Sequence, residues 1–157
     1  MSIHEIIRQY KPAQHNLLNI LHALQDSNPA NYLSSEALEE TAKHLKLTKS
    51  AVYGVATYYT MFSLVPRGRY IIRICISPVC EMMKSEKIIK ILEDLLGIKA
   101  GQTSSDNLFT LEYSECLGQC QKAPSMMVNQ KVYTSLDKES ILEIIQEYRA
   151  KAAKNKS

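Results

Sequence analysis

Apolar residues in the first 64 positions recur at the three- and four-residue spacing of amphipathic helices. One apolar face runs from Leu17 to Leu24. Ser34 and Ser35 can cap a second helix, whose acidic first turn suits the positive end of a helix dipole. A third helix is expected from about Thr48 to Phe62, and Pro66-Arg67-Gly68 breaks the pattern. The sequence therefore predicts an N-terminal group of helices.

After residue 68 the helical spacing gives way to short runs rich in β-branched residues. Tyr70 to Ile76 and Leu108 to Tyr113 are predicted to be strands, and Met82 to Leu96 lies between them as an amphipathic helix. Two short strands are expected around a hairpin turn at Asn129-Gln130. With a final helix, the order strand, helix, three strands and helix predicts a small α/β sandwich of the thioredoxin type.

These patterns divide the chain into three parts. We expect a helical interaction arm over residues 1–66, a thioredoxin-like domain over residues 67–150 and a basic tail over residues 151–157. The last helix of the domain is expected to begin at Ser135 or Asp137. The tail is expected to be frayed and solvated, because it is rich in lysine and lies at the chain end.

Composition excludes several classes of protein. With 45% hydrophobic residues among 157, the chain is expected to fold around a core rather than stay disordered. The net charge of +3 is small, so we expect no nucleic-acid partner. No apolar run approaches the roughly 18 residues that span a bilayer, and the first residues lack the apolar core of a signal peptide. We therefore expect a cytoplasmic protein that does not insert into a membrane, although it can be peripheral to a membrane complex.

All four cysteines stand in two close pairs, Cys75 with Cys80 and Cys116 with Cys120. Each pair lies where a predicted strand ends, so four thiolates can converge on one centre. Cys80 also lies just before the predicted helix, whose positive end is expected to lower the pKa of its thiol. In a reducing compartment, clustered thiols are more often ligands or redox groups than structural disulfides. Neither pair has the C-x-x-C spacing of a thioredoxin-like dithiol. The cysteines are therefore candidate ligands of a metal ion or an iron–sulfur cluster.

Structural zinc is the main alternative to an iron–sulfur cluster, because spacers of three and four residues occur in zinc sites. However, zinc ribbons usually separate their pairs by about 15 to 20 residues, whereas a helix and a strand intervene here. No histidine follows His44, which removes a Rieske centre, and the remaining histidines are scattered without metal spacing. The spacing favours an iron–sulfur cluster, and a zinc-stabilised interaction module without a redox role stays open.

Several segments between about Leu17 and Tyr148 carry a family resemblance: Val55 to Phe62, Pro66-Arg67-Gly68, Cys75-x4-Cys80, Phe109 to Glu112, Glu115-Cys116-Leu117-Gly118-Gln119-Cys120 and Ala123-Pro124. They resemble the thioredoxin-like [2Fe–2S] subunit found beside the flavoprotein subunit of NADH:quinone oxidoreductase, with relatives in NAD-linked hydrogenases and formate dehydrogenases. The resemblance implies that Cys75, Cys80, Cys116 and Cys120 bind one [2Fe–2S] cluster. Ile-Ser-Pro-Val, between the first two cysteines, departs from the relatives and can alter hydrogen bonding to the cluster.

The resemblance also implies a function. The chain would be an electron-transfer subunit that exchanges single electrons with the FMN of a partner subunit, in a complex with further iron–sulfur subunits. FMN and NAD(H) are expected on the flavoprotein partner, because this chain lacks a Gly-rich phosphate loop of the dinucleotide-binding kind. Nor does it show an acid–base or nucleophile–base pair, so we expect no catalytic residues.

The segment from Leu33 to Phe62 is similar to a helix-turn-helix, a unit that can bind DNA. Its second helix has no arginine between Ala51 and Phe62, whereas a helix that recognises bases in the major groove needs polar side chains. We instead expect an interaction arm that packs on a partner, using residue types enriched in interface cores: Tyr53, Tyr58, Tyr59 and Met61. The alternative is that these side chains cover the core of the arm itself.

Overall fold

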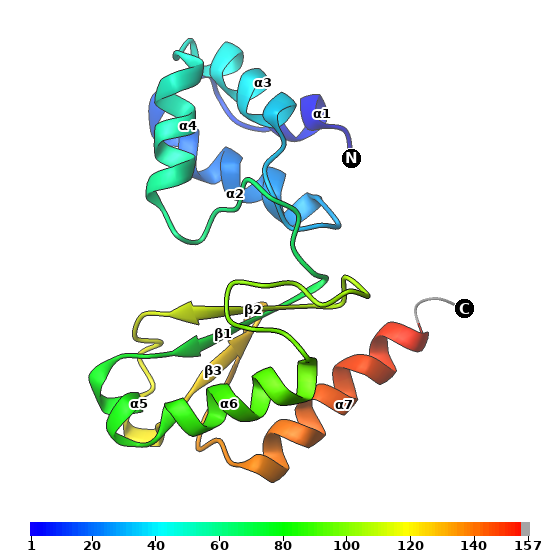
Figure 1. The fold of residues 1–157 in the computed structure, drawn as a ribbon. Coiled ribbons are helices and arrows are strands. Elements are labelled where there is room, and N and C mark those ends of the chain that lie inside the picture. Colours follow the sequence, from blue (N-terminus) through cyan, green and yellow to red (C-terminus); the bar gives the residue numbers. More distant parts are fainter. Residues whose placement is uncertain (155–157) are drawn as a thin grey trace. The chain divides into compact units, whose positions relative to one another are not determined.

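The computed structural model describes residues 1–154, which divide into two compact units, Met1–Arg67 and a second unit that begins at Gly68 (Figure 1). Each unit has a hydrophobic core of its own. No helix in the described part of the chain combines the length and the apolar character needed to cross a membrane.

The first unit is a group of helices: α1 (Ile3–Ile7), the 3₁₀ turn η1 (Gln14–Asn16), α2 (Leu17–Ser27), α3 (Ser35–Leu45) and α4 (Lys49–Tyr58). Side-chain caps set the starts of two helices, and the cap at Ser34 is as predicted. Ser34 Oγ accepts the Ala37 N–H at 3.1 Å, and Thr48 Oγ1 accepts the Ala51 N–H at 3.2 Å. Neither α1 nor η1 is expected from the sequence, because five or three residues are too few to show an apolar period.

The second unit is built on a four-stranded sheet of order β2-β1-β3-β4, with these elements: β1 (Tyr70–Cys75), α5 (Pro78–Met82), α6 (Ser85–Leu96), β2 (Phe109–Ser114), the 3₁₀ turn η2 (Cys120–Lys122), β3 (Met126–Val128), β4 (Lys131–Tyr133) and α7 (Lys138–Lys154). β1 is parallel to β2 and antiparallel to β3, and β3 and β4 form the expected hairpin. The predicted mixed α/β fold is confirmed.

The sheet has one apolar face and one more polar face. Tyr70, Ile72 and Ile74 alternate along β1 and enter the core that α6 and α7 cover (Figure 1). On the other face, Arg73 Nε lies 3.1 Å from Glu112 Oε2. The alternation places Cys75 on the side of Arg73, away from the two long helices.

The helix predicted from Met82 to Leu96 corresponds to α6, and the short helix α5, which the sequence does not predict, precedes it. Lys84 has a left-handed backbone (φ 67°) and separates α5 from α6, which begins at Ser85. A helix of five residues completes little more than one turn, so the pattern does not reveal α5. Its presence changes the surroundings of Cys80, which lies inside α5.

The chain end also differs from the prediction. Residues 151–154 belong to α7 and are not a frayed tail. Ala152 is buried in the core, and Lys151 forms an ion pair with Glu147 one turn earlier. Residues 155–157 of the expected tail lie outside the described residues.

Candidate functional site

The two cysteine pairs lie at the same edge of the sheet. β1 and β2 run parallel with Cys75 opposite Ser114, so the segments that follow both strands leave at the same end. Figure 1 shows α5 and the loop after β2 at that end. The topology therefore brings together segments that are about 40 residues apart in sequence.

The first pair is buried. Cys75 ends β1 and Cys80 lies in α5, and each has only 1% of its surface exposed. Pro78 occupies the first turn of α5, where a missing N–H leaves no unsatisfied donor. The two thiols contact each other and form a small cluster with Ala123.

The second pair is exposed and its sulfurs are close together. Cys116 Sγ lies 3.4 Å from Cys120 Sγ, and the Gly118 N–H donates to Cys116 Sγ at 3.4 Å. Gly118 has a left-handed backbone (φ 74°), a conformation that costs glycine little. This turn folds the chain back so that both thiols point to the same side of the loop.

Contacts between the two loops join the pairs into one site. The main chain of Leu117 hydrogen-bonds to Cys75, and its side chain packs against the buried pair. The Cys75 N–H donates to the Ser125 carbonyl at 3.1 Å. Cys120 also interacts electrostatically with both buried thiols. The four cysteines therefore share one environment, with an inner and an outer pair.

The inner pair is electrostatically asymmetric. Burial raises the pKa of the Cys75 thiol, but hydrogen bonds, above all from Ser77, outweigh that effect and hold the pKa below its ordinary value. Burial also raises the pKa of Cys80, and hydrogen bonds from Ser125 offset this only in part. The sequence places Cys80 just before a helix that would lower its pKa. That expectation is wrong, because Cys80 lies within α5 and desolvation dominates.

The outer pair behaves as two adjacent like groups. The Cys116 sulfur raises the pKa of Cys120, first through a hydrogen bond and then through charge. Binding of a cation would offset the repulsion between the two sulfurs, because a metal stabilises the thiolate form of both groups.

Zinc and a two-iron cluster require different arrangements of the four donors. Within residues 1–154, no group of three or more His, Cys, Asp or Glu side chains is arranged to hold a single metal ion. One tetrahedral zinc ion would need four ligands around a single point. A [2Fe–2S] cluster needs four thiolates spread over two irons, which two separate pairs can supply. The two pairs of thiols, one buried and one exposed, are therefore a donor set of the kind that a two-iron cluster requires.

The site also includes two serines, which were not identified from the sequence. Ser77 hydrogen-bonds to Cys75, and Ser125 Oγ lies 3.6 Å from Cys80 Sγ. Ser77 could have been suspected because it lies between the first two cysteines. Ser125 could not, because its contact with Cys80 spans 45 positions and arises only when β3 pairs with β1.

The histidines have structural contacts of their own. His44 Nε2 lies 2.9 Å from the Tyr10 carbonyl, His22 packs on Phe62, and His4 faces Glu40 at 3.5 Å. These contacts give the three histidines surface or core roles, in keeping with their scattered spacing in the sequence.

On the first unit, the residues suggested as an interaction surface separate into two groups. Tyr53, Tyr58 and Met61 are exposed, with 78% of Tyr58 accessible, whereas Tyr59 packs against the core. The idea that all four cover the arm's own core therefore holds only for Tyr59.

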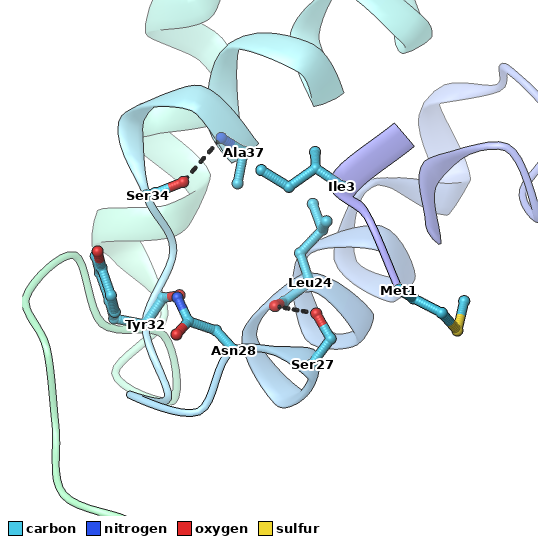
Figure 2. A pocket seen from close by; sticks show the side chains of 8 residues that line it. All are labelled: Met1, Ile3, Leu24, Ser27, Asn28, Tyr32, Ser34 and Ala37. Atoms are coloured by element: carbon cyan, nitrogen blue, oxygen red, sulfur yellow. Dashed lines mark hydrogen bonds between the residues drawn. The ribbon is translucent and has the colours of Figure 1, made fainter. Parts of the chain in front are cut away.

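A hollow on the first unit offers no comparable chemistry (Figure 2). Its polar walls serve the local fold, since Ser27 Oγ donates to the Leu24 carbonyl at 2.8 Å and Ser34 caps α3. The residues that line it include no Asp, Glu, His, Lys, Arg or Cys.

Comparison with known proteins agrees with the geometry of the cysteine site. The family described as thioredoxin-like [2Fe-2S] ferredoxin matches residues 3–149. The chain is 35% identical over 146 residues to an NADH-quinone oxidoreductase subunit of Aquifex aeolicus (strain VF5), covering 93% of this chain and 90% of that protein. It is 37% identical over 145 residues to the corresponding protein of Rickettsia prowazekii (strain Madrid E), covering 91% and 81%.

A solved structure shows the same fold. An NAD+-reducing [NiFe]-hydrogenase in the air-oxidized state superposes with a TM-score of 0.77 at 24% identity, over 87% of this chain and 23% of the hydrogenase chain. This chain thus corresponds to a minor part of that longer protein. From the family match over nearly its whole length and from its relatives, the chain belongs to the thioredoxin-like [2Fe-2S] ferredoxin family, whose cofactor is a [2Fe–2S] cluster.

Proposed function

We propose that this chain is the electron-transfer subunit of an NAD(H)-linked flavoprotein complex, and that Cys75, Cys80, Cys116 and Cys120 bind its single [2Fe–2S] cluster. The observation that carries the proposal is the meeting of the two cysteine pairs at one edge of the sheet, with one pair buried and the other exposed. The names of the relatives, which are components of NADH-quinone oxidoreductase, support the kind of complex.

When bound, the cluster supplies one-electron chemistry, and the chain's residues control its surroundings. The inner pair would shield one side from water, because Cys75 and Cys80 are buried beneath Leu117 and Ala123. The outer pair would leave the other side near solvent or a partner. Hydrogen bonds from Ser77, Ser125 and Gly118 to the sulfurs would help to set the reduction potential.

The electron partner in this proposal is the FMN of a separate flavoprotein subunit, which would also bind NAD(H). A group of exposed apolar side chains lies on the segment that carries Cys80. We call it the apolar rim: Ile76, Val79, Met82 and Met83. Flexible Met side chains adapt to a partner surface, and 82% of Met82 is exposed. We therefore place the flavoprotein on the rim, where it would be close to the outer pair.

The first unit would dock on another part of the complex through Tyr53, Tyr58 and Met61. DNA binding is less consistent with its surface, because acidic side chains neutralise two of its lysines. Lys43 Nζ lies 2.7 Å from Glu40 Oε1, and Lys49 Nζ lies 3.2 Å from Glu39 Oε2. Free thiols fit a reducing compartment such as the cytoplasm, where we place this complex.

The ligand assignment can be tested on the purified chain. Protein purified without oxygen should be red-brown and contain two irons per chain, and dithionite should produce the electron paramagnetic resonance signal of a reduced [2Fe–2S] cluster. Cys116→Ser should change that spectrum and lower the iron content. Gln121→Ser, an exposed change in the same loop, should leave both unchanged. A colourless wild-type protein containing zinc would instead support the zinc-stabilised module, and a Cys116→Ser spectrum identical to wild type would refute the assignment.

A further inference from the structure

Ser125 has a buried hydroxyl that faces a candidate ligand. Its side chain is 1% exposed, and its Oγ lies 3.6 Å from Cys80 Sγ. A sulfur that binds iron as a thiolate carries no proton, so in the loaded protein only the serine hydroxyl can donate in this contact. The distance is suitable for a hydrogen bond to sulfur, whose radius exceeds that of oxygen.

The position of this hydroxyl is fixed by main-chain contacts on both sides. The Ser125 carbonyl accepts the Cys75 N–H at 3.1 Å, and its main chain also hydrogen-bonds to Cys80. The next residue, Met126, begins β3 and pairs with Ile74 of β1. Ser125 is therefore held against the inner pair by the sheet itself and has little freedom to turn away.

We propose that Ser125 is a positioning residue that raises the reduction potential of the [2Fe–2S] cluster. Its hydroxyl would do so by donating a hydrogen bond to Cys80 Sγ. This inference rests on the proposed function, because it requires Cys80 to be a ligand. Reduction adds one electron and increases the negative charge on the cluster and its sulfurs. A donor to sulfur therefore stabilises the reduced state more than the oxidised state. Burial strengthens the effect, because little water competes for the sulfur.

Ser125 is a better test of such tuning than Ser77. Ser77 acts on Cys75 first through its main chain and only then through its side chain, so replacing the side chain would leave the larger contact in place. Ser125→Ala removes a single oxygen atom and keeps both main-chain contacts. Its effect on the potential can thus be separated from an effect on the loop.

The experiment is a redox titration of the full chain with its cluster, followed by visible absorption and electron paramagnetic resonance. At the ambient potential where half the wild-type cluster is reduced, Ser125→Ala should show a ratio of reduced to oxidised cluster about tenfold lower. For a one-electron couple this corresponds to a midpoint about 59 mV more negative. Ser125→Thr keeps the hydroxyl and should stay close to wild type. Ser85→Ala, which removes another buried hydroxyl of this unit, should not change the ratio.

A second measurement begins with the wild-type protein, so it is informative even if the variant does not load a cluster. Transfer of the wild-type protein to D₂O should shift the iron–sulfur stretching bands in resonance Raman spectra, and Ser125→Ala should lose part of that shift. An unchanged midpoint in a fully loaded Ser125→Ala protein would overturn the inference and leave the proposed function intact. If the variant does not load, absence of any D₂O shift in the wild type would overturn it. A wild-type protein without a [2Fe–2S] spectrum would refute the proposed function itself.

Discussion

At the scale of single residues, Tyr148 is a buried phenol in the core of the second unit. Its hydroxyl lies 3.1 Å from the Tyr133 hydroxyl, and its ring packs against Tyr70. Burial, with a smaller contribution from Tyr133, raises the pKa of Tyr148 to about 12. The pKa of Tyr148 is higher in the folded protein than in the unfolded chain, where it is near 10. The stability that its neutral phenol contributes is therefore fully present below pH 10. It is lost as the pH rises from 10 to about 12.

Tyr148→Phe should therefore lose less stability in alkali than the wild type. Between pH 9 and pH 11 the free energy of unfolding should fall by on the order of 1 kcal/mol less in the variant. Urea unfolding followed by circular dichroism at the two pH values measures this difference. Other titrating groups are shared by both proteins, so identical pH dependence would contradict the pKa of Tyr148.

Residues differ in how far the sequence reveals their roles. The four cysteines are singled out as candidates by their pairing alone, and Asn107 has φ 54°, a left-handed conformation that asparagine tolerates. Ser125 could not be found, because its partner is fixed by strand pairing rather than by a local pattern. The sequence predicts the pKa of Cys80 in the wrong direction, since it does not show how much water a side chain loses.

At the scale of elements, the segment leading into β1 crosses very close to the start of β2. A Cβ atom on Gly68 would lie 2.7 Å from the Phe109 carbonyl carbon and 2.9 Å from the Phe109 nitrogen. The Gly68 N–H also donates to Thr110 Oγ1 at 2.6 Å. Backbone atoms paired within a sheet cannot move away as a flexible side chain could. The close approach therefore requires glycine at this position.

Gly68→Ala should lower the free energy of unfolding by about 1 to 3 kcal/mol, the usual cost of overpacking. Gly54→Ala is the matched control, because nothing lies within 4 Å of its added Cβ and it is inside α4. That change should raise stability by about 0.5 to 1 kcal/mol, since alanine loses less entropy in a helix. Denaturant titration of both variants measures the contrast. Equal stability of Gly68→Ala and wild type would show that the backbone at Phe109 can move to make room for the added Cβ.

Element length decides what a hydrophobic pattern reveals. Helices of three or more turns, such as α2, α3 and α6, leave an apolar stripe that predicts them. α5 has five residues and leaves no stripe, so the pattern does not predict it and places Cys80 outside a helix. The end of α7 is missed for another reason, because its exposed lysines hide the single buried Ala152.

At the scale of the whole molecule, each unit combines a closed core with a separate set of exposed apolar residues. Tyr53, Tyr58 and Met61 form one set, and the apolar rim beside Cys80 forms the other. Exposed apolar groups of this kind often mark interaction sites, and a subunit of a larger complex needs them. The sequence singles out the cysteine pairs and the tyrosines of the arm, but the exposure of Met82 and Met83 is seen only in the structure.

The rim gives the last prediction, which concerns assembly. The double change Met82→Lys and Met83→Lys should weaken binding to the flavoprotein subunit at least about tenfold, equivalent to about 1.4 kcal/mol, because two charges would replace apolar contacts. The cluster's absorption spectrum should stay the same, since both side chains are largely exposed to solvent in the free chain.

Glu143→Lys, a change at an exposed position on α7, is the control for added positive charge. Binding is measured by titrating the labelled chain with the flavoprotein, and the rate of cluster reduction by NADH through FMN should fall in parallel. Unchanged affinity with a normal cluster would place the flavoprotein on another surface.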